Sequence, residues 1–222
     1  MNKVLVLIII LGLLSGYVPA PASPNNQATS KIINLKEKTV STNKIDFDKD
    51  TQLEEVQIVL DDGYFTEDNE MWSGNGPKWV GKFSFKVLKN GKIIFSESIN
   101  KLMGNSEEIF LYSPEFKLCF NDYNKDGQLD FTVSQYFSSN GSEVYLFSID
   151  KAGKIKPLEI ENKTSFFTSP HTIENSLQLD FQSSQIAVWY YDNVEGAYFT
   201  DFYSWDELKN KFVLTGQEKE ES

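Results

Sequence analysis

One polar segment of the chain reads Asp122-Tyr123-Asn124-Lys125-Asp126-Gly127-Gln128-Leu129-Asp130. Side chains that carry oxygen stand at its first, third and fifth positions, with a glycine at the sixth and an acid at the ninth. The residues that follow, 131–137, are rich in β-forming types. The pattern therefore predicts a tight polar turn that leads directly into a strand.

The spacing of oxygen atoms in this segment suits a hard metal ion. Calcium takes roughly six to eight oxygen ligands, and alternating Asp and Asn side chains supply several of them from one short turn. Gly127 stands where such a turn bends sharply, and an EF-hand is excluded because Val133 occupies the position of its bidentate glutamate. The segment, called the second loop below, is predicted to bind Ca²⁺.

A matching segment, called the first loop, reads Asp46-Phe47-Asp48-Lys49-Asp50-Thr51-Gln52-Leu53-Glu54. The two segments align without a gap at an offset of 76 residues, from Asp46 to Asp122. Agreement at so many positions indicates an internal structural repeat. Because Thr51 replaces the glycine, the first loop is expected to bind metal more weakly or not at all.

The N-terminus has the features of a secretory signal peptide. Lys3 precedes an apolar run at residues 4–14, which is short for a membrane span, and Ala20-Pro21-Ala22 matches a cleavage site. A retained N-terminal anchor is the alternative, and a lipoprotein anchor is excluded because no cysteine follows the run. The predicted organisation is a signal peptide (1–22), a linker with a first edge segment (23–40), an all-β repeat domain (41–216) and a charged tail (217–222). The protein is thus expected to be secreted or extracytoplasmic, in the cell envelope.

The composition narrows the classes of partner and activity. The formal net charge is −11 and the chain has no arginine, so nucleic acid and anionic membrane surfaces are unexpected partners. Cys119 is the only cysteine, so an intramolecular disulfide is excluded. Its thiol is expected to be buried and inert. His171 is the only histidine, and no catalytic motif accompanies it. An enzyme is not expected, although a glycosidase needs only two carboxylates.

Strand and turn signals recur along the rest of the chain. Residues 82–88 alternate between polar and apolar types, and Asn90-Gly91 and Asn140-Gly141 are typical two-residue hairpin turns. Asp61-Asp62-Gly63 reads as another turn, and residues 99–103 as a short helix or loop. Residues 116–120 and 177–181 read as strands. Roughly ten short strands with regular turn signals predict an all-β antiparallel domain. Repeated loop–strand–turn–strand units would build either propeller-like blades or a β-sandwich.

Two tryptophans mark a candidate ligand-binding surface. Residues 64–79 read as a long polar loop, and Trp72 and Trp79 flank a Gly/Pro turn at its end. Exposed there, the two indole rings would stack on a sugar or anchor a protein partner. Alternatively, one or both rings fold back onto the core.

The second loop and the strand after it resemble the calcium loop of FG-GAP/VCBS-type repeats, found in integrin propellers and many secreted bacterial proteins. Tyr203-Ser204-Trp205-Asp206 with Lys211-Phe212-Val213-Leu214 is similar to the closing hairpin of such bacterial chains. The resemblance implies metal ligands at Asp122, Asn124, Asp126, Gln128 (backbone carbonyl) and Asp130, and correspondingly at Asp46, Asp48, Asp50, Gln52 (backbone carbonyl) and Glu54. The second loop with residues 144–147 also looks similar to bacterial envelope proteins related to lysozyme inhibitors.

These features favour a calcium-binding interaction module outside the cytoplasm. Its partner would be a protein or cell-wall glycan, without nucleic acid and without membrane insertion after signal cleavage. An inhibitor of a wall-degrading enzyme and a purely structural scaffold are the alternatives that the sequence leaves open.

Overall fold

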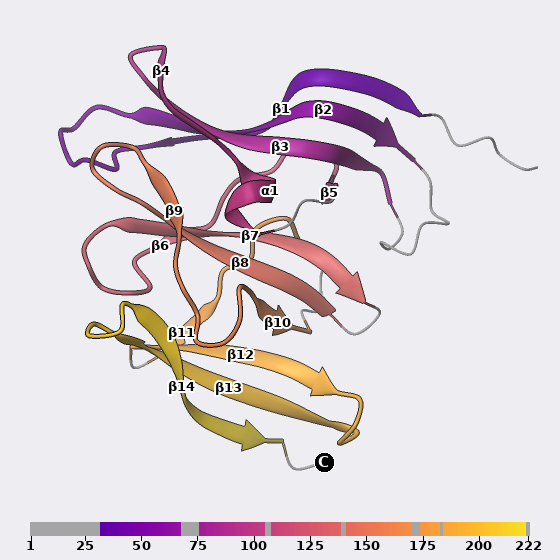
Figure 1. Cartoon of the computed structure of the whole chain (residues 1–222), viewed down its shortest axis with the longest axis vertical. Coiled ribbons are helices and arrows are strands. Elements are labelled where there is room, and N and C mark those ends of the chain that lie inside the picture. The colour runs from indigo at the N-terminus through magenta and orange to yellow at the C-terminus, as the bar shows by residue number, and fades with distance from the viewer. Residues whose placement is uncertain are drawn as a thin grey trace, which may run out of the picture.

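The computed structural model describes residues 32–67, 76–104, 108–138, 141–169, 174–182 and 184–220. These residues form three antiparallel sheets that stack in chain order (Figure 1). The first sheet contains β1 (Ile33–Ile45), β2 (Glu54–Thr66), β3 (Lys78–Lys89), β4 (Lys92–Ser98) and β5 (Ile109–Tyr112). The second contains β6 (Phe120–Asn121), β7 (Leu129–Ser138), β8 (Gly141–Ile149), β9 (Ile155–Pro157) and β10 (Phe166–Thr168). The third contains β11 (Asp180–Gln182), β12 (Gln185–Asp192), β13 (Ala197–Asp206) and β14 (Lys211–Lys219).

Each sheet is a meander of strands that follow one another in the chain. In the first sheet β4 and β5 pair with successive parts of the same edge of β3, and in the second β9 and β10 pair with β8 in the same way. The predicted all-β antiparallel architecture is therefore confirmed. As far as the described residues show, the three sheets are open and none closes on itself.

Two hydrophobic layers hold the stack together. Between the first and second sheets, the ring of Phe85 meets the rings of Phe131 and Phe147 edge-on, with centroid distances of 5.4 and 5.0 Å. Between the second and third sheets, Phe166 packs against Tyr203 and Phe212. The middle sheet is thus covered on both faces, which explains why almost every residue of β8 is buried.

The predicted hairpins and the short helix are present. Asn90 and Gly91 join β3 to β4 with φ values of 52° and 72°, as a tight turn of this kind requires. β7 and β8 pair as a hairpin, although Asn140 itself lies outside the described residues. Helix α1 (Ile99–Leu102) begins after Ser98, whose side chain accepts a hydrogen bond from the Lys101 amide.

Three local predictions are wrong. Asp61-Asp62-Gly63 is not a turn but lies inside β2, at a register shift between Leu60 and Asp62 opposite β3. The segment 116–120 is a strand only at its end, in β6, because Phe116 makes just an isolated bridge to Ser41. The segment 177–181 likewise pairs only from Asp180, in β11.

The described residues also bear on the predicted chain limits. β1 and β14 run past the expected domain limits at residues 41 and 216. Within the described part of the chain, no helix has the length and apolar character needed to cross a membrane. The predicted signal peptide, His171 and Trp72 lie outside the described residues.

Candidate functional site

The two acidic loops connect paired strands in the same register. The first loop joins β1 to β2, and the residue before it, Ile45, pairs with its ninth residue, Glu54. The second loop joins β6 to β7, and the residue before it, Asn121, pairs with its ninth residue, Asp130. Each loop is therefore the tip of an antiparallel hairpin, held at both ends by ladder hydrogen bonds.

The backbones of the two loops also bend at the same positions. Lys49 and Thr51, at the fourth and sixth positions of the first loop, have φ values of 63° and 74°. Lys125 and Gly127, at the same positions of the second loop, have φ values of 59° and 80°. Thr51 thus adopts the left-handed conformation that glycine adopts easily and a β-branched residue does not.

Alternate side chains of each loop accept hydrogen bonds from its own backbone. In the second loop the amides of Gly127 and Gln128 donate to Asp122 Oδ2 and Asp126 Oδ1, at 3.0 and 2.8 Å. The amide of Asp126 donates to Asn124 Oδ1 at 3.1 Å. The first loop has the matching three bonds, accepted by Asp46, Asp48 and Asp50. Backbone donors therefore hold the acidic side chains on one side of each turn.

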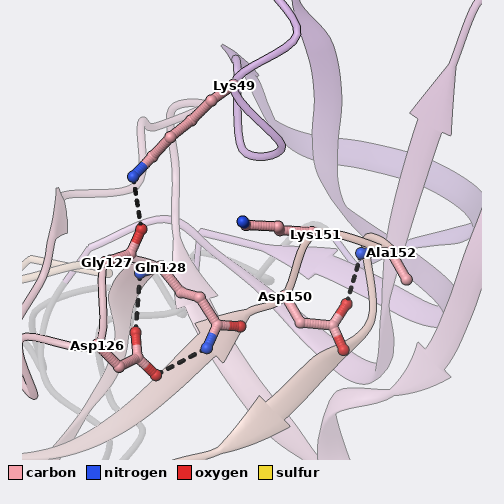
Figure 2. Close-up of a pocket in the computed structure, with 7 residues that line it drawn as sticks. All are labelled: Lys49, Asp126, Gly127, Gln128, Asp150, Lys151 and Ala152. Carbon is pink, nitrogen blue, oxygen red and sulfur yellow. Dashed lines mark hydrogen bonds between the residues drawn. The ribbon is translucent and has the colours of Figure 1, made fainter.

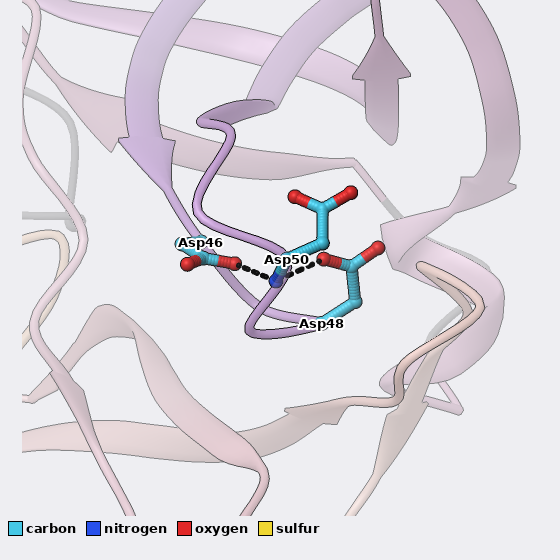
Figure 3. A group of neighbouring side chains, drawn as sticks. All are labelled: Asp46, Asp48 and Asp50. Carbon is cyan, nitrogen blue, oxygen red and sulfur yellow. Dashed lines mark hydrogen bonds between the residues drawn. The ribbon is translucent and has the colours of Figure 1, made fainter.

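In the first loop the carboxylates form a tight cluster. Asp46, Asp48 and Asp50 each offer an oxygen, and these oxygens lie within 4.8 Å of one another. Figure 3 shows Asp46 and Asp48 both accepting a hydrogen bond from the backbone amide of Asp50. Clustered carboxylates of this kind repel one another unless a cation lies among them.

The cation at the first loop is the ammonium group of Lys89, from the end of β3. Its Nζ lies 2.5 Å from Asp48 Oδ2, 2.7 Å from Asp50 Oδ2 and 3.0 Å from Glu54 Oε1. These hydrogen bonds raise the pKa of Lys89 far above its usual value, and the bond from Lys89 lowers the pKa of Asp50. Nothing in the local spacing of the loop points to Lys89, so the sequence analysis missed it.

The second loop differs from the first in its charge partners. Among the described residues, no basic side chain forms a salt bridge with Asp122, Asp126 or Asp130. Asp130 is fully buried, and its Oδ2 accepts hydrogen bonds from the amides of Tyr123 and Asn124. The Ser148 hydroxyl of the paired strand β8 is the one further donor to Asp130 in the described residues. Oδ1 of Asp122 is buried without a hydrogen-bond partner there.

Burial determines the protonation of Asp130. It raises the pKa of this carboxyl to about 7, against the smaller opposing effect of the hydrogen bonds that it accepts. Buried polar atoms are almost always satisfied by a donor or an ion. A bound cation would satisfy a buried oxygen of this kind, together with the other oxygens that alternate along the loop.

An open pocket of about 480 Å³ adjoins the second loop (Figure 2). On one side Lys49 of the first loop donates from Nζ to the carbonyl oxygen of Gly127, at 2.9 Å, and so links the two loops. On the other side Asp150 accepts a hydrogen bond from the Ala152 amide, and Lys151 extends into the space between. The pocket has mixed charge and gives solvent ions access to the outer side of the second loop.

Of the two tryptophans of the predicted binding surface, Trp72 lies outside the described residues and Trp79 does not lie on the surface. Trp79 is only 5% exposed and packs in the core between the first and second sheets, with its ring 6.4 Å from that of Phe65. The alternative, that this indole folds back onto the core, is therefore correct for Trp79. The reason is the pleat of β3, which directs Trp79 to the inner face of its sheet.

The ten predicted ligand residues all lie in the described part of the chain, as two sets of five at the tips of two hairpins. The structure brings Asp46, Asp48 and Asp50 together in one loop, and buries Asp130 in the other. Comparisons with models of protein families, with curated proteins and with solved structures find no match to this chain.

Proposed function

We propose that the second loop binds one Ca²⁺ ion, and that the protein is a calcium-stabilised binding module of the FG-GAP/VCBS type that acts outside the cytoplasm. The observation that carries the proposal is a pair of buried carboxylate oxygens, Oδ1 of Asp122 and Oδ1 of Asp130, to which the described residues offer no donor beyond the Ser148 hydroxyl at Asp130. A calcium ion would supply the missing partner. It would also neutralise carboxylates that form no salt bridge with a basic side chain of the described residues.

The ligands would come from alternate positions of the loop. They are the side chains of Asp122, Asn124, Asp126 and Asp130 and the carbonyl oxygen of Gln128. The side-chain amide of Gln128 donates to Asp126 Oδ2 at 2.7 Å, so this residue also holds a ligand in place. Binding would stabilise the turn between β6 and β7 in the middle sheet. Both hydrophobic layers pack on this sheet, one on each face.

The location outside the cytoplasm rests on the signal features of residues 1–22 and on the acidic, arginine-free composition. Extracellular calcium modules commonly bind with Kd values of roughly 0.1–1 mM, which suits calcium outside the cell. The partner of the module would be a protein or a cell-wall glycan. No catalytic role is proposed.

Thermal unfolding tests the calcium site. At about 2 mM calcium, a site with the Kd range above adds roughly 0.6–1.8 kcal/mol to the free energy of unfolding. For a chain of this size that corresponds to a rise in Tm of roughly 1–7 °C over the value in EGTA. The rise is expected with calcium, and not with magnesium at the same concentration.

Two matched variants show whether the second loop is responsible. Asp126→Ala removes a proposed ligand and is expected to abolish the calcium-dependent rise in Tm. Asp206→Ala removes an aspartate of the turn between β13 and β14, away from the pocket beside the second loop, where it accepts bonds from the amides of Leu208 and Lys209, and is expected to keep the rise. An equal rise in wild type and Asp126→Ala would contradict the proposed site, and so would no rise in wild type.

A further inference from the structure

The two loops differ in the residue that faces their ninth position from the neighbouring strand. In the second sheet Asp130 pairs with Ser148 of β8. In the first sheet Glu55 pairs with Leu88, so the next step along this antiparallel pair places Lys89 opposite Glu54. The same place in the two hairpins is thus taken by a lysine in one case and by a serine in the other.

Lys89 contacts the same loop positions that are proposed to bind metal in the second loop. Its Nζ reaches the third, fifth and ninth residues, which are Asp48, Asp50 and Glu54, all within 3.0 Å. The matching residues of the second loop are Asn124, Asp126 and Asp130. Ser148 carries no charge and is too short to reach all three positions, and its buried hydroxyl acts on Asp130.

The ninth residue of the first loop independently indicates a cation at this point. The side chain of Glu54 is fully buried, and its Oε2 has no hydrogen-bond partner in the described part of the chain. Its only ion pair there is with Lys89. A buried carboxylate is tolerated when a cation compensates it, and removal of that cation is costly.

We infer that Lys89 occupies the metal position of the first loop, so that this loop needs no metal and only the second loop takes calcium from solution. The statement about the second loop rests on the proposed function. The role of Lys89 in the first loop does not depend on it. Lys89 excludes a divalent ion by filling the space between the carboxylates and by charge repulsion. Removing the ammonium group should therefore expose a second divalent-cation site, made by Asp46, Asp48, Asp50, Glu54 and the carbonyl oxygen of Gln52.

Calcium titration by calorimetry counts the sites. We expect one calcium ion bound by wild type and two by Lys89→Met, which keeps the length of the side chain and removes its charge. Lys86→Met, a change of the same kind on the same strand, is expected to leave one. In the Asp126→Ala background, Lys89→Met should raise the number from none to one.

The outcomes separate this inference from the proposed function. If wild type binds no calcium and Lys89→Met binds one, the role of Lys89 stands and the proposed calcium site of the second loop fails. If Lys89→Met binds no more calcium than its parent in either background, the role of Lys89 is overturned. If Lys86→Met gains a site equally, the gain reflects net charge alone, and the inference is again overturned.

Lys89→Met leaves Glu54 buried without its partner, so folding is monitored by circular dichroism in EGTA and in calcium. A variant that folds only with calcium supports the inference directly. If it folds in neither, Lys89→Met/Glu54→Gln decides, because a glutamine oxygen is still a calcium ligand but carries no charge. That double variant is expected to gain one site over wild type, and no gain would overturn the inference.

Discussion

At the scale of single residues, the protein has two fully buried acids in equivalent places and compensates only one of them internally. Glu54 pairs with Lys89, whereas the partners of Asp130 in the described residues are all uncharged: two backbone amides and the hydroxyl of Ser148. Burying an ionised carboxylate without a cation is unfavourable, so such a group holds its proton to higher pH. This is the physical cause of the raised pKa of Asp130.

The stability of the calcium-free protein should therefore fall with pH because of Asp130. Its pKa is about 7 in the folded protein, and that of aspartate in an unfolded chain is about 3.9. Between these values the folded state holds a proton that the unfolded state has lost, so the contribution of this group to stability falls as pH rises from about 4 to about 7. The total loss is at most about 4 kcal/mol.

Urea unfolding in EGTA at several pH values between 5 and 8 measures this loss, with Asp130→Asn as the control. The amide does not ionise, so the difference in unfolding free energy between variant and wild type should grow in favour of the variant as pH rises. Parallel pH profiles for the two proteins would contradict the assignment. Calcium added at pH 8 should stabilise wild type more than the variant, because the amide oxygen of asparagine is still a ligand but lacks the negative charge of the ionised carboxylate.

At the scale of secondary-structure elements, a glycine pair determines how β2 and β3 pair beyond their register shift. Gly63 and Gly81 lie opposite each other. A Cβ on Gly63 would lie 2.1 Å from the carbonyl oxygen of Val80, and one on Gly81 would lie 2.3 Å from that of Asp62. The sequence analysis took Gly63 as the end of a turn, but its role is to allow close approach of two backbones.

Gly63→Ala should accordingly separate the strands locally. The clash is with backbone atoms, which cannot rotate away, so a cost of about 3 kcal/mol in unfolding free energy is expected, at the upper end of the usual range for overpacking. Gly91→Ala is the control, because no atom lies within 4 Å of its added Cβ and the cost is only that of its positive φ, about 1 kcal/mol. Equal losses for the two variants in urea unfolding would refute the role of the glycine pair.

At the scale of the whole molecule, the three sheets share two hydrophobic layers and should unfold together. Phe85, fully buried on β3, lies against Phe131 and Phe147 of the second sheet. Its ring therefore belongs to one core built from two sheets. Hairpins of this size are marginal alone, and packing against another layer gives them independent stability.

Phe85→Ala should lower the free energy of unfolding by about 3–5 kcal/mol, because it leaves a cavity between two sheets. Phe137→Ala, at a side chain that is 54% exposed, should cost about 1 kcal/mol or less. Urea unfolding followed by both tryptophan fluorescence and circular dichroism measures both values. Transitions that separate between the two probes in Phe85→Ala would show that the sheets unfold independently, contrary to the shared core.

Much of the local structure follows from neighbouring residues and was predictable. Alternation along residues 82–88 and the Asn90-Gly91 turn determine the β3–β4 hairpin, because each depends only on the pleat and on residues that tolerate positive φ. The shared bends of the two loops follow from their shared pattern of acids. β6 and β11 are shorter than the strands predicted at 116–120 and 177–181. The apolar residues of these segments pack against the sheets, but most of them have no neighbouring strand to pair with.

The sequence by itself determined most of the long strands, the Asn-Gly hairpin turns and the shared bends of the two acidic loops, because these depend on interactions between residues close together in the chain. Only the tertiary structure decided that the loops differ in their cation. Lys89 reaches the first loop from another strand through the register of β2 with β3, and Asp130 loses its solvent when the middle sheet is covered. Pairing register and burial come from contacts between distant residues, which local spacing does not record.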